Sequence, residues 1–196
     1  MKKKLIIKIF ILSTFVILIS CGRNNNYYPK PRGFFRIDLP QKKYKNFDSI
    51  SFPFAFSMPV YSYIEPVKSD EVNSLWFNIN FPKLNGNINF SYRPLNGNLY
   101  ELSEDAREFT NKHIAKANEI LQIRISNEDK KVYGIIYDIE GTNSASPYQF
   151  FLTDSTNHFL RGAVYFNHVP NNDSIAPIIS RVKEDIDTII STFRWK

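Results

Sequence analysis

The sequence predicts a single α+β domain with an antiparallel sheet and two main helices. Short aromatic-rich runs alternate apolar with polar residues, which is typical of strands half-buried in a sheet. Two longer stretches repeat apolar residues at helical spacing, and one of them closes the chain. The chain has 196 residues, of which 43% are hydrophobic and 15% aromatic, as expected for one globular core. Strands in antiparallel pairs with segregated helices favour the α+β class.

The predicted strands fall into two hairpins and their neighbours. An aromatic-rich segment over 52–67 opens the series. Segments 75–82 and 86–95 alternate Phe or Ile with Asn or Ser, and a three-residue connection predicts an antiparallel hairpin. Further strands are expected over 121–125, 131–140, 148–153 and 158–166. The polar residues between the last two, 154–157, predict the turn of a second hairpin.

Two helices are expected, each with a start signal. Asn98, with Glu101 three residues later, resembles a capping box, and apolar residues then recur at helical spacing as far as Ile120. The second helix is expected after an Asp173 N-cap, with Pro177 in its first turn. A short strand over 192–194 would follow. This order of elements resembles the PsbP-like α-β-α sandwich, an analogy of pattern that implies no function.

Composition and spacing exclude several classes of function. The seven glycines match neither G-x-G-x-x-G nor the P-loop pattern, and the three histidines form no H-E-x-x-H. We therefore predict no cofactor, no metal ion and no small-molecule substrate. Residues 1–20 contain four lysines and no acid, so the net charge falls from +6 to +2 without them. That small charge gives no reason to expect nucleic acid as a partner.

Residues 1–20 have the parts of a lipoprotein signal peptide. Lysines precede an apolar run from Ile9 to Ile19, which is about half the ~20 residues that a membrane span needs. The run ends in Leu18-Ile19-Ser20-Cys21, which looks like a bacterial lipobox. Cys21 is then lipidated and becomes the first mature residue. Its acyl chains, palmitate among them, would anchor the protein to a membrane of the cell envelope, facing the periplasm.

Residues 21–46 are predicted to be an extended tether, and 47–196 the globular domain. The tether is polar and basic, and its prolines at 29, 31 and 40 favour extended backbone. The pair Phe34-Phe35 lies between Arg32 and Arg36. A plain spacer needs no such apolar and planar cationic groups. Part of the tether is therefore expected to dock, either on its own domain or on a partner.

The turn of the second hairpin holds the residue types of a nucleophilic triad. Asp154, Ser155 and His158 lie within five positions of each other. Residues so close together in a turn cannot easily form the chain of hydrogen bonds from carboxylate to imidazole to hydroxyl that a triad requires. In addition, no G-x-S-x-G elbow surrounds Ser155. The sequence therefore favours turn formation here over catalysis.

Arg161 lies in the following strand, on the face it shares with aromatic residues. A cation on such a face is usually paired, and we expect Asp154 or Asp138 as its partner, with a binding role as the alternative. Gly162 beside it would permit a bulge or a close backbone approach.

Two segments together resemble the gliding motility lipoprotein GldD family. They are YPKPRGFFRIDLP at 28–40, directly after the lipobox, and QFFLTDSTNHFLRGA at 149–163. The resemblance extends to the end of the chain, TFRWK at 192–196. It implies an accessory lipoprotein that bacterial gliding and the associated type IX protein secretion require, with no known catalysis. Envelope proteins of that machinery are the implied partners.

Two functional hypotheses follow. The favoured one is a non-catalytic, membrane-anchored interaction module. Its predicted contact surface comprises Pro29, Pro31, Arg32, Gly33, Phe34, Phe35 and Arg36 of the tether, with Asp154, Ser155, His158 and Arg161 of the second hairpin. The alternative is a cell-envelope hydrolase that uses Asp154 and His158. The absence of a nucleophile motif, a metal cluster and a phosphate loop from the sequence favours the first.

The lipobox generates a direct prediction. Cys21→Ala removes the thiol that would be acylated, so we expect an uncut precursor or a soluble product that does not support motility. Membrane fractionation with a measurement of mature mass checks this. A Cys21→Ala protein that stays fully membrane-bound at the mature size would contradict the anchor.

Overall fold

The computed structural model of the chain describes residues 36–68 and 74–196. Its main feature is a seven-stranded sheet in which every neighbouring pair is antiparallel, in the order β3-β4-β5-β9-β8-β7-β6. The strands are β3 (Tyr63–Val67), β4 (Leu75–Phe81), β5 (Gly86–Pro94), β6 (Glu119–Asn127), β7 (Val132–Glu140), β8 (Tyr148–Thr153) and β9 (His158–Phe166).

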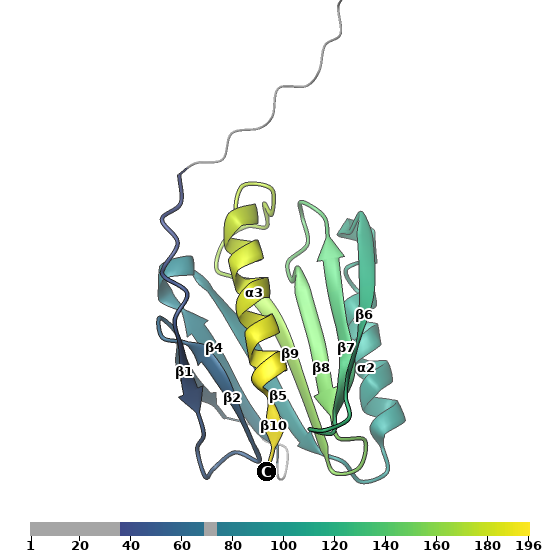
Figure 1. The fold of residues 1–196 in the computed structure, drawn as a ribbon. Helices are drawn as coiled ribbons and strands as arrows, with labels where there is room; N and C mark the ends of the chain where they lie inside the picture. Colours follow the sequence, from purple (N-terminus) through teal and green to yellow (C-terminus); the bar gives the residue numbers. More distant parts are fainter. Residues whose placement is uncertain (1–35, 69–73) are drawn as a thin grey trace, which may run out of the picture. The chain divides into compact units, whose positions relative to one another are not determined.

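A smaller sheet and two helices complete the fold (Figure 1). The three-stranded sheet has the order β1-β2-β10, formed by β1 (Tyr44–Phe47), β2 (Phe54–Pro59) and β10 (Arg194–Trp195). The α-helices are α2 (Leu99–Asn111) and α3 (Ala176–Thr192), and two short 3-10 helices are η1 (Pro82–Leu84) and η2 (Ile114–Lys116). The α+β class, with an antiparallel sheet and two main helices, is confirmed.

Side chains alternate across the large sheet and build a separate apolar cluster on each face. On one face, α3 and β2 cover the sheet, and the main core contains Phe54, Phe77, Phe90, Phe150 and Ile186 among its buried residues. The opposite face carries a smaller cluster. There α2 packs on β8 and β9 through Leu102, Ala106, Tyr137, Phe151 and Phe159.

Both predicted hairpins are present. β4 and β5 pair from Leu75↔Tyr92 to Phe81↔Gly86, and their connection is η1. β8 and β9 pair across the 154–157 turn, with Thr153 opposite Phe159. Local alternation and turn residues were sufficient to predict these pairs.

The first helix is shorter than predicted. It ends at Asn111, and Ile120, expected in this helix, lies in β6. The reason is tertiary, because β6 pairs with β7 from Glu119↔Glu140 to Asn127↔Val132 and so satisfies its backbone in the sheet. The predicted capping box is also wrong. The Asn98 side chain accepts a hydrogen bond from the Asn96 N–H and makes no cap bond to the helix.

The closing helix begins later than predicted. Its first residue is Ala176, so Asp173 is not the N-cap, and the Asp173 carboxylate instead accepts a hydrogen bond from the Thr142 hydroxyl at 3.0 Å. Pro177 does lie in the first turn, as expected. The last strand is β10 rather than 192–194, since Thr192 still belongs to α3.

A buried carboxylate joins the N-terminal strand to α3. β1 begins at Tyr44, within the segment predicted to be tether, and pairs with β2. The Tyr44 hydroxyl donates to Asp185 Oδ1 at 3.0 Å, and the Tyr61 hydroxyl donates to Oδ2. Asp185 is fully buried. Burial raises the pKa of its carboxyl, and the two hydroxyl donors act against that rise.

Within the described ranges, 36–68 and 74–196, no helix has the length and apolar character needed to cross a membrane.

The Asp185 contacts predict a specific loss of stability. Tyr61→Phe removes one donor from a buried carboxylate, and we expect the free energy of unfolding to fall by about 1.5–3 kcal/mol in urea denaturation. Tyr63→Phe is the matched control, because Tyr63 is 51% exposed, and it should change stability by less than about 0.5 kcal/mol. Equal effects of the two substitutions would show that the Tyr61–Asp185 contact does not stabilise the fold.

Candidate functional site

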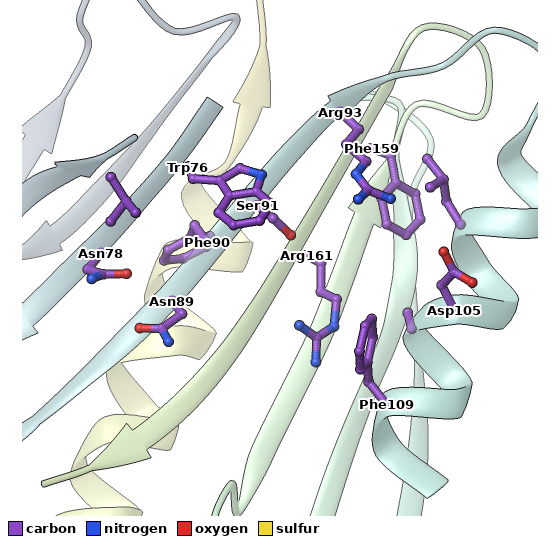
Figure 2. A pocket seen from close by; sticks show the side chains of 13 residues that line it. Trp76, Asn78, Asn89, Phe90, Ser91, Arg93, Asp105, Phe109, Phe159 and Arg161 are labelled. Carbon is purple, nitrogen blue, oxygen red and sulfur yellow. The ribbon is translucent and has the colours of Figure 1, made fainter. Parts of the chain in front are cut away.

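A cavity of 410 Å³ lies between α2 and the part of the sheet formed by β4, β5 and β9 (Figure 2). Apart from Phe90, whose ring belongs to the main core, the strands contribute residues from the face opposite that core, and α2 contributes the facing wall. Its polar lining consists of Asn78, Asn89, Ser91, Arg93, Asp105 and Arg161. Its aromatic lining consists of Trp76, Phe90, Phe109 and Phe159. The cavity therefore combines guanidinium, amide and aromatic groups in one place.

Strand alternation puts these groups together. Trp76 lies opposite Ser91, and Asn78 opposite Asn89, in the β4–β5 register. Ser91 in turn lies opposite Arg161 in the β5–β9 register. Because neighbours across antiparallel strands share a face, the indole, the amides and the guanidinium all project from the same side of the sheet.

Arg161 is the one residue of the predicted surface that combines a charge with a place in this cavity. Its Nη2 donates to Gln149 Oε1 at 2.6 Å, and its Cζ lies 4.7 Å from the centroid of the Phe109 ring. Burial lowers the pKa of the guanidinium, which remains a cation at neutral pH.

The predicted acidic partners of Arg161 are wrong. Asp138 lies on the opposite face of the sheet and forms an ion pair with Lys183 of α3. Asp154 is occupied in its own turn. Across residues 36–68 and 74–196, no carboxylate lies within ion-pair distance of Arg161, and the Gln149 amide, the Tyr165 hydroxyl and the Phe109 ring take that place.

Other cations strengthen the positive field around Phe109. The Lys112 ammonium lies 4.7 Å from the centroid of the same ring. Burial lowers the pKa of His113, and the nearby charges of Arg161 and Lys116 lower it further. Protonation of that imidazole is thus disfavoured by a surrounding that is already positive.

Gly162 allows the Phe150 ring to pack closely against the backbone of β9, and it does not form a bulge. The β8–β9 register is continuous through Phe150↔Gly162 and Phe151↔Arg161. A Cβ at Gly162 would lie 2.4 Å from Cζ of Phe150, so the missing side chain makes room for that ring in the main core.

The Asp154 carboxylate holds the turn of the second hairpin. Its Oδ1 accepts the backbone N–H groups of Thr156, Asn157 and His158 at 3.0, 2.8 and 2.8 Å. Partial burial by itself would raise the pKa of Asp154, but these donors outweigh it and lower the pKa to about 2. Ser155 occupies the left-handed region at φ 69°, as a tight turn requires.

The hydrogen bond and the stacking contact of the His158 ring are made with residues other than Asp154. Its Nδ1 shares a hydrogen bond of 2.9 Å with the Tyr92 hydroxyl, and its ring stacks on Trp195 with centroids 4.9 Å apart. In the described part of the chain, no hydrogen bonds connect the Ser155 hydroxyl, the His158 ring and the Asp154 carboxylate in series. The geometry is that of a turn.

Of the remaining predicted site residues, the structure describes only Arg36. Cys21, Pro29, Pro31, Arg32, Gly33, Phe34 and Phe35 lie outside the described residues. Arg36 is exposed, and its Nε donates to Asp38 at 3.2 Å. Among residues 36–68 and 74–196, no three His, Cys, Asp or Glu side chains gather as metal ligands would.

Sequence reasoning missed most of the cavity. It did not assign Trp76, Asn78, Asn89 or Phe109 to a site. A signal for the first two exists, because Trp76 and Asn78 are outward positions of an alternating strand whose inward Phe77, Ile79 and Phe81 are fully buried. The Phe109 contact depends on where α2 lies on the sheet, which no local pattern specifies.

Comparisons with known proteins identify a family and a fold. The sequence model of the family described as gliding motility lipoprotein GldD matches residues 24–195. The solution structure of cyanobacterial PsbP (CyanoP) from Synechocystis sp. is similar with a TM-score of 0.50 and 11% sequence identity, covering 81% of this chain and 95% of that one. This likeness bears out the predicted PsbP-like fold. Among curated proteins, none matches the chain.

The Asp154 turn predicts a pH-dependent loss of stability. Asp154→Ala removes the acceptor of three backbone N–H groups and should lower the free energy of unfolding by about 1–3 kcal/mol at pH 7. Asp154→Asn keeps an acceptor oxygen and should lose less. Because the folded pKa is depressed, the wild-type contribution is present above the unfolded value of 3.8 and disappears as the pH falls through about 2.

Urea denaturation between pH 7 and pH 2 measures both effects. The stability difference between wild type and Asp154→Ala should shrink over the acid range. A constant difference, or an Asp154→Ala protein as stable as wild type, would contradict the structural role of the carboxylate.

Proposed function

The chain belongs to the gliding motility lipoprotein GldD family, and we propose that it is a non-catalytic, membrane-anchored interaction module required for gliding and the associated type IX protein secretion. The observation that carries the proposal is the family match over residues 24–195, which includes most of the tether and almost the whole domain. The proposed role therefore uses both the tether and the globular domain.

The anchor places the domain at a membrane of the cell envelope. In the proposal, Cys21 carries the acyl chains after residues 1–20 are removed, and the domain faces the periplasm. Two or more chains suffice for stable attachment, so the protein needs no spanning helix. The tether then limits how far from the bilayer the domain can reach its partners.

The proposed contact surface combines the segment 29–36 with the second hairpin. The hairpin is suited to recognition because three backbone bonds to Asp154 fix its tip and because β8 and β9 form the middle of the large sheet. Rigid elements lose little entropy on binding. Arg161, on the same strand as His158, carries the charge of this surface into the cavity beside α2.

The geometry gives the rival hydrolase little support. An acid–base relay needs the carboxylate to orient the imidazole. Here Asp154 is used by backbone donors, and the His158 ring is oriented by Tyr92 and Trp195. The two residues therefore serve the turn and its packing in our proposal.

The proposed docking role of the tether is tested by replacing residues 29–36 with an equally long Gly/Ser stretch. This keeps length and solubility but removes Phe34, Phe35 and their flanking arginines, so we expect motility and secretion to be lost. Colony spreading and secreted protein are the measurements. As a matched control, eight Gly/Ser residues inserted between Asn25 and Asn26 lengthen the tether and leave the segment intact, and function should persist.

Unchanged motility and secretion after the replacement would contradict docking. Loss of function with an unchanged melting temperature of the purified protein indicates contact with a partner. Loss accompanied by a lower melting temperature indicates that the segment folds onto its own domain.

A further inference from the structure

We propose that the cavity between α2 and the sheet binds an acidic saccharide, with Arg161 holding its carboxylate and Trp76 packing against a sugar ring. This inference deepens the proposed function, on which it rests for its setting in the cell envelope. The evidence lies in the charge, the floor and the walls of the cavity.

The charge calls for an anion. Arg161 is a half-buried guanidinium whose described partners are neutral: the Gln149 amide, the Tyr165 hydroxyl and the Phe109 ring. A cation removed from water without a counter-charge is unfavourable, and a carboxylate would supply that charge. The planar fork of an arginine matches the two oxygens of a carboxylate. Lys112, over the same phenyl ring, makes the surroundings more attractive to an anion.

The floor of the cavity suits a ligand rich in hydroxyl groups. Asn78, Asn89 and Ser91 line it from β4 and β5. Amide and hydroxyl side chains both donate and accept hydrogen bonds, as sugar hydroxyls do. The row continues along the strands, where Asn80 lies opposite Asn87. A simple anion such as phosphate is too small to form hydrogen bonds with this whole row of amides.

The walls supply flat apolar surface. Trp76 is 37% exposed and Phe109 45% exposed, although both line the cavity. Figure 2 shows the Trp76 indole projecting from the sheet and the Phe109 ring from α2, with the Arg161 guanidinium beside Phe109. An exposed indole offers a broad surface for the C–H face of a sugar ring. The volume of 410 Å³ falls in the usual range of small-ligand sites, about 300–1,000 Å³.

A peptide is a poorer fit for the same cavity. Extended peptides bind by adding a strand to a free sheet edge. The floor strands β4, β5 and β9 each have a neighbour on both sides, so their backbone groups are already paired. The cavity therefore presents side chains only. Asp105 on α2 adds one negative charge at the wall, so a ligand held by charge alone gains less there than one that also contacts the amides and the indole.

The test uses the full mature lipoprotein in detergent and Trp76 as its own reporter. The chain has two tryptophans, so Trp195→Phe leaves Trp76 as the only indole. In that background we expect tri-galacturonic acid to change the fluorescence saturably. Its methyl ester, which lacks the charges, should bind at least about tenfold more weakly.

Three substitutions locate the binding by calorimetry. Arg161→Gln and Trp76→Leu should each weaken affinity for tri-galacturonic acid at least about tenfold. Arg124→Gln is the matched control, because Arg124 is an exposed arginine on β6 away from the cavity, and it should leave affinity unchanged. Melting temperatures of all variants show whether they fold. If Arg161→Gln does not fold, Arg161→Lys replaces it, because it keeps the charge and removes the planar fork.

The proposal is overturned if the acid does not bind, if the methyl ester binds equally well, or if Arg124→Gln weakens binding as much as Arg161→Gln. Equal binding of a tripeptide with a free C-terminal carboxylate would also overturn it, by showing that the carboxylate alone is recognised. Failure of binding here leaves the proposed function standing, since motility after replacement of residues 29–36 judges that separately.

Discussion

The fold depends on how much of a seven-stranded sheet one helix can cover. At ~4.8 Å between strands the sheet is about 29 Å wide, whereas a helix with its side chains is about 10 Å across. On one face α3 and β2 together bury the apolar side chains. On the other, α2 packs mainly on β8 and β9, so the outward residues of β4 and β5 remain partly open. Those positions include the amides and the serine of the cavity floor and the Trp76 indole of its wall.

The covered face makes the open one rigid. The Phe150 ring fills the space that Gly162 leaves, and this fixes the middle of β9 next to Arg161. The side-chain oxygen of Gln149, on β8, accepts a hydrogen bond from the guanidinium of Arg161. The charge in the cavity is thus positioned by two central strands and by the core behind them. A side chain held in this way loses little freedom when a ligand binds.

Sequence reasoning succeeded where structure is local. The β4–β5 and β8–β9 hairpins follow from alternation and turn residues, and the Asp154 turn follows from the residue types at its tip. It failed where pairing or packing with a distant part of the chain determines the secondary structure or the partner of a residue. Ile120 fits a helical pattern, yet β7 draws it into β6, and the expected partner of Arg161 at Asp138 lies on the other side of the sheet. The cavity arises from the position of α2, so its lining could be only partly foreseen.

The central proposal is that the open half of the α2 face, which holds the cavity, meets the ligand of the protein. Photo-crosslinking in gliding cells tests it directly, with a photoreactive amino acid at the exposed Asn89 on β5 and, for comparison, at the exposed Ser180 on the outer side of α3. We expect adducts of higher mass from Asn89 that decrease with Arg161→Gln, and few from Ser180. Adducts from Ser180 alone, with none from Asn89, would contradict the claim.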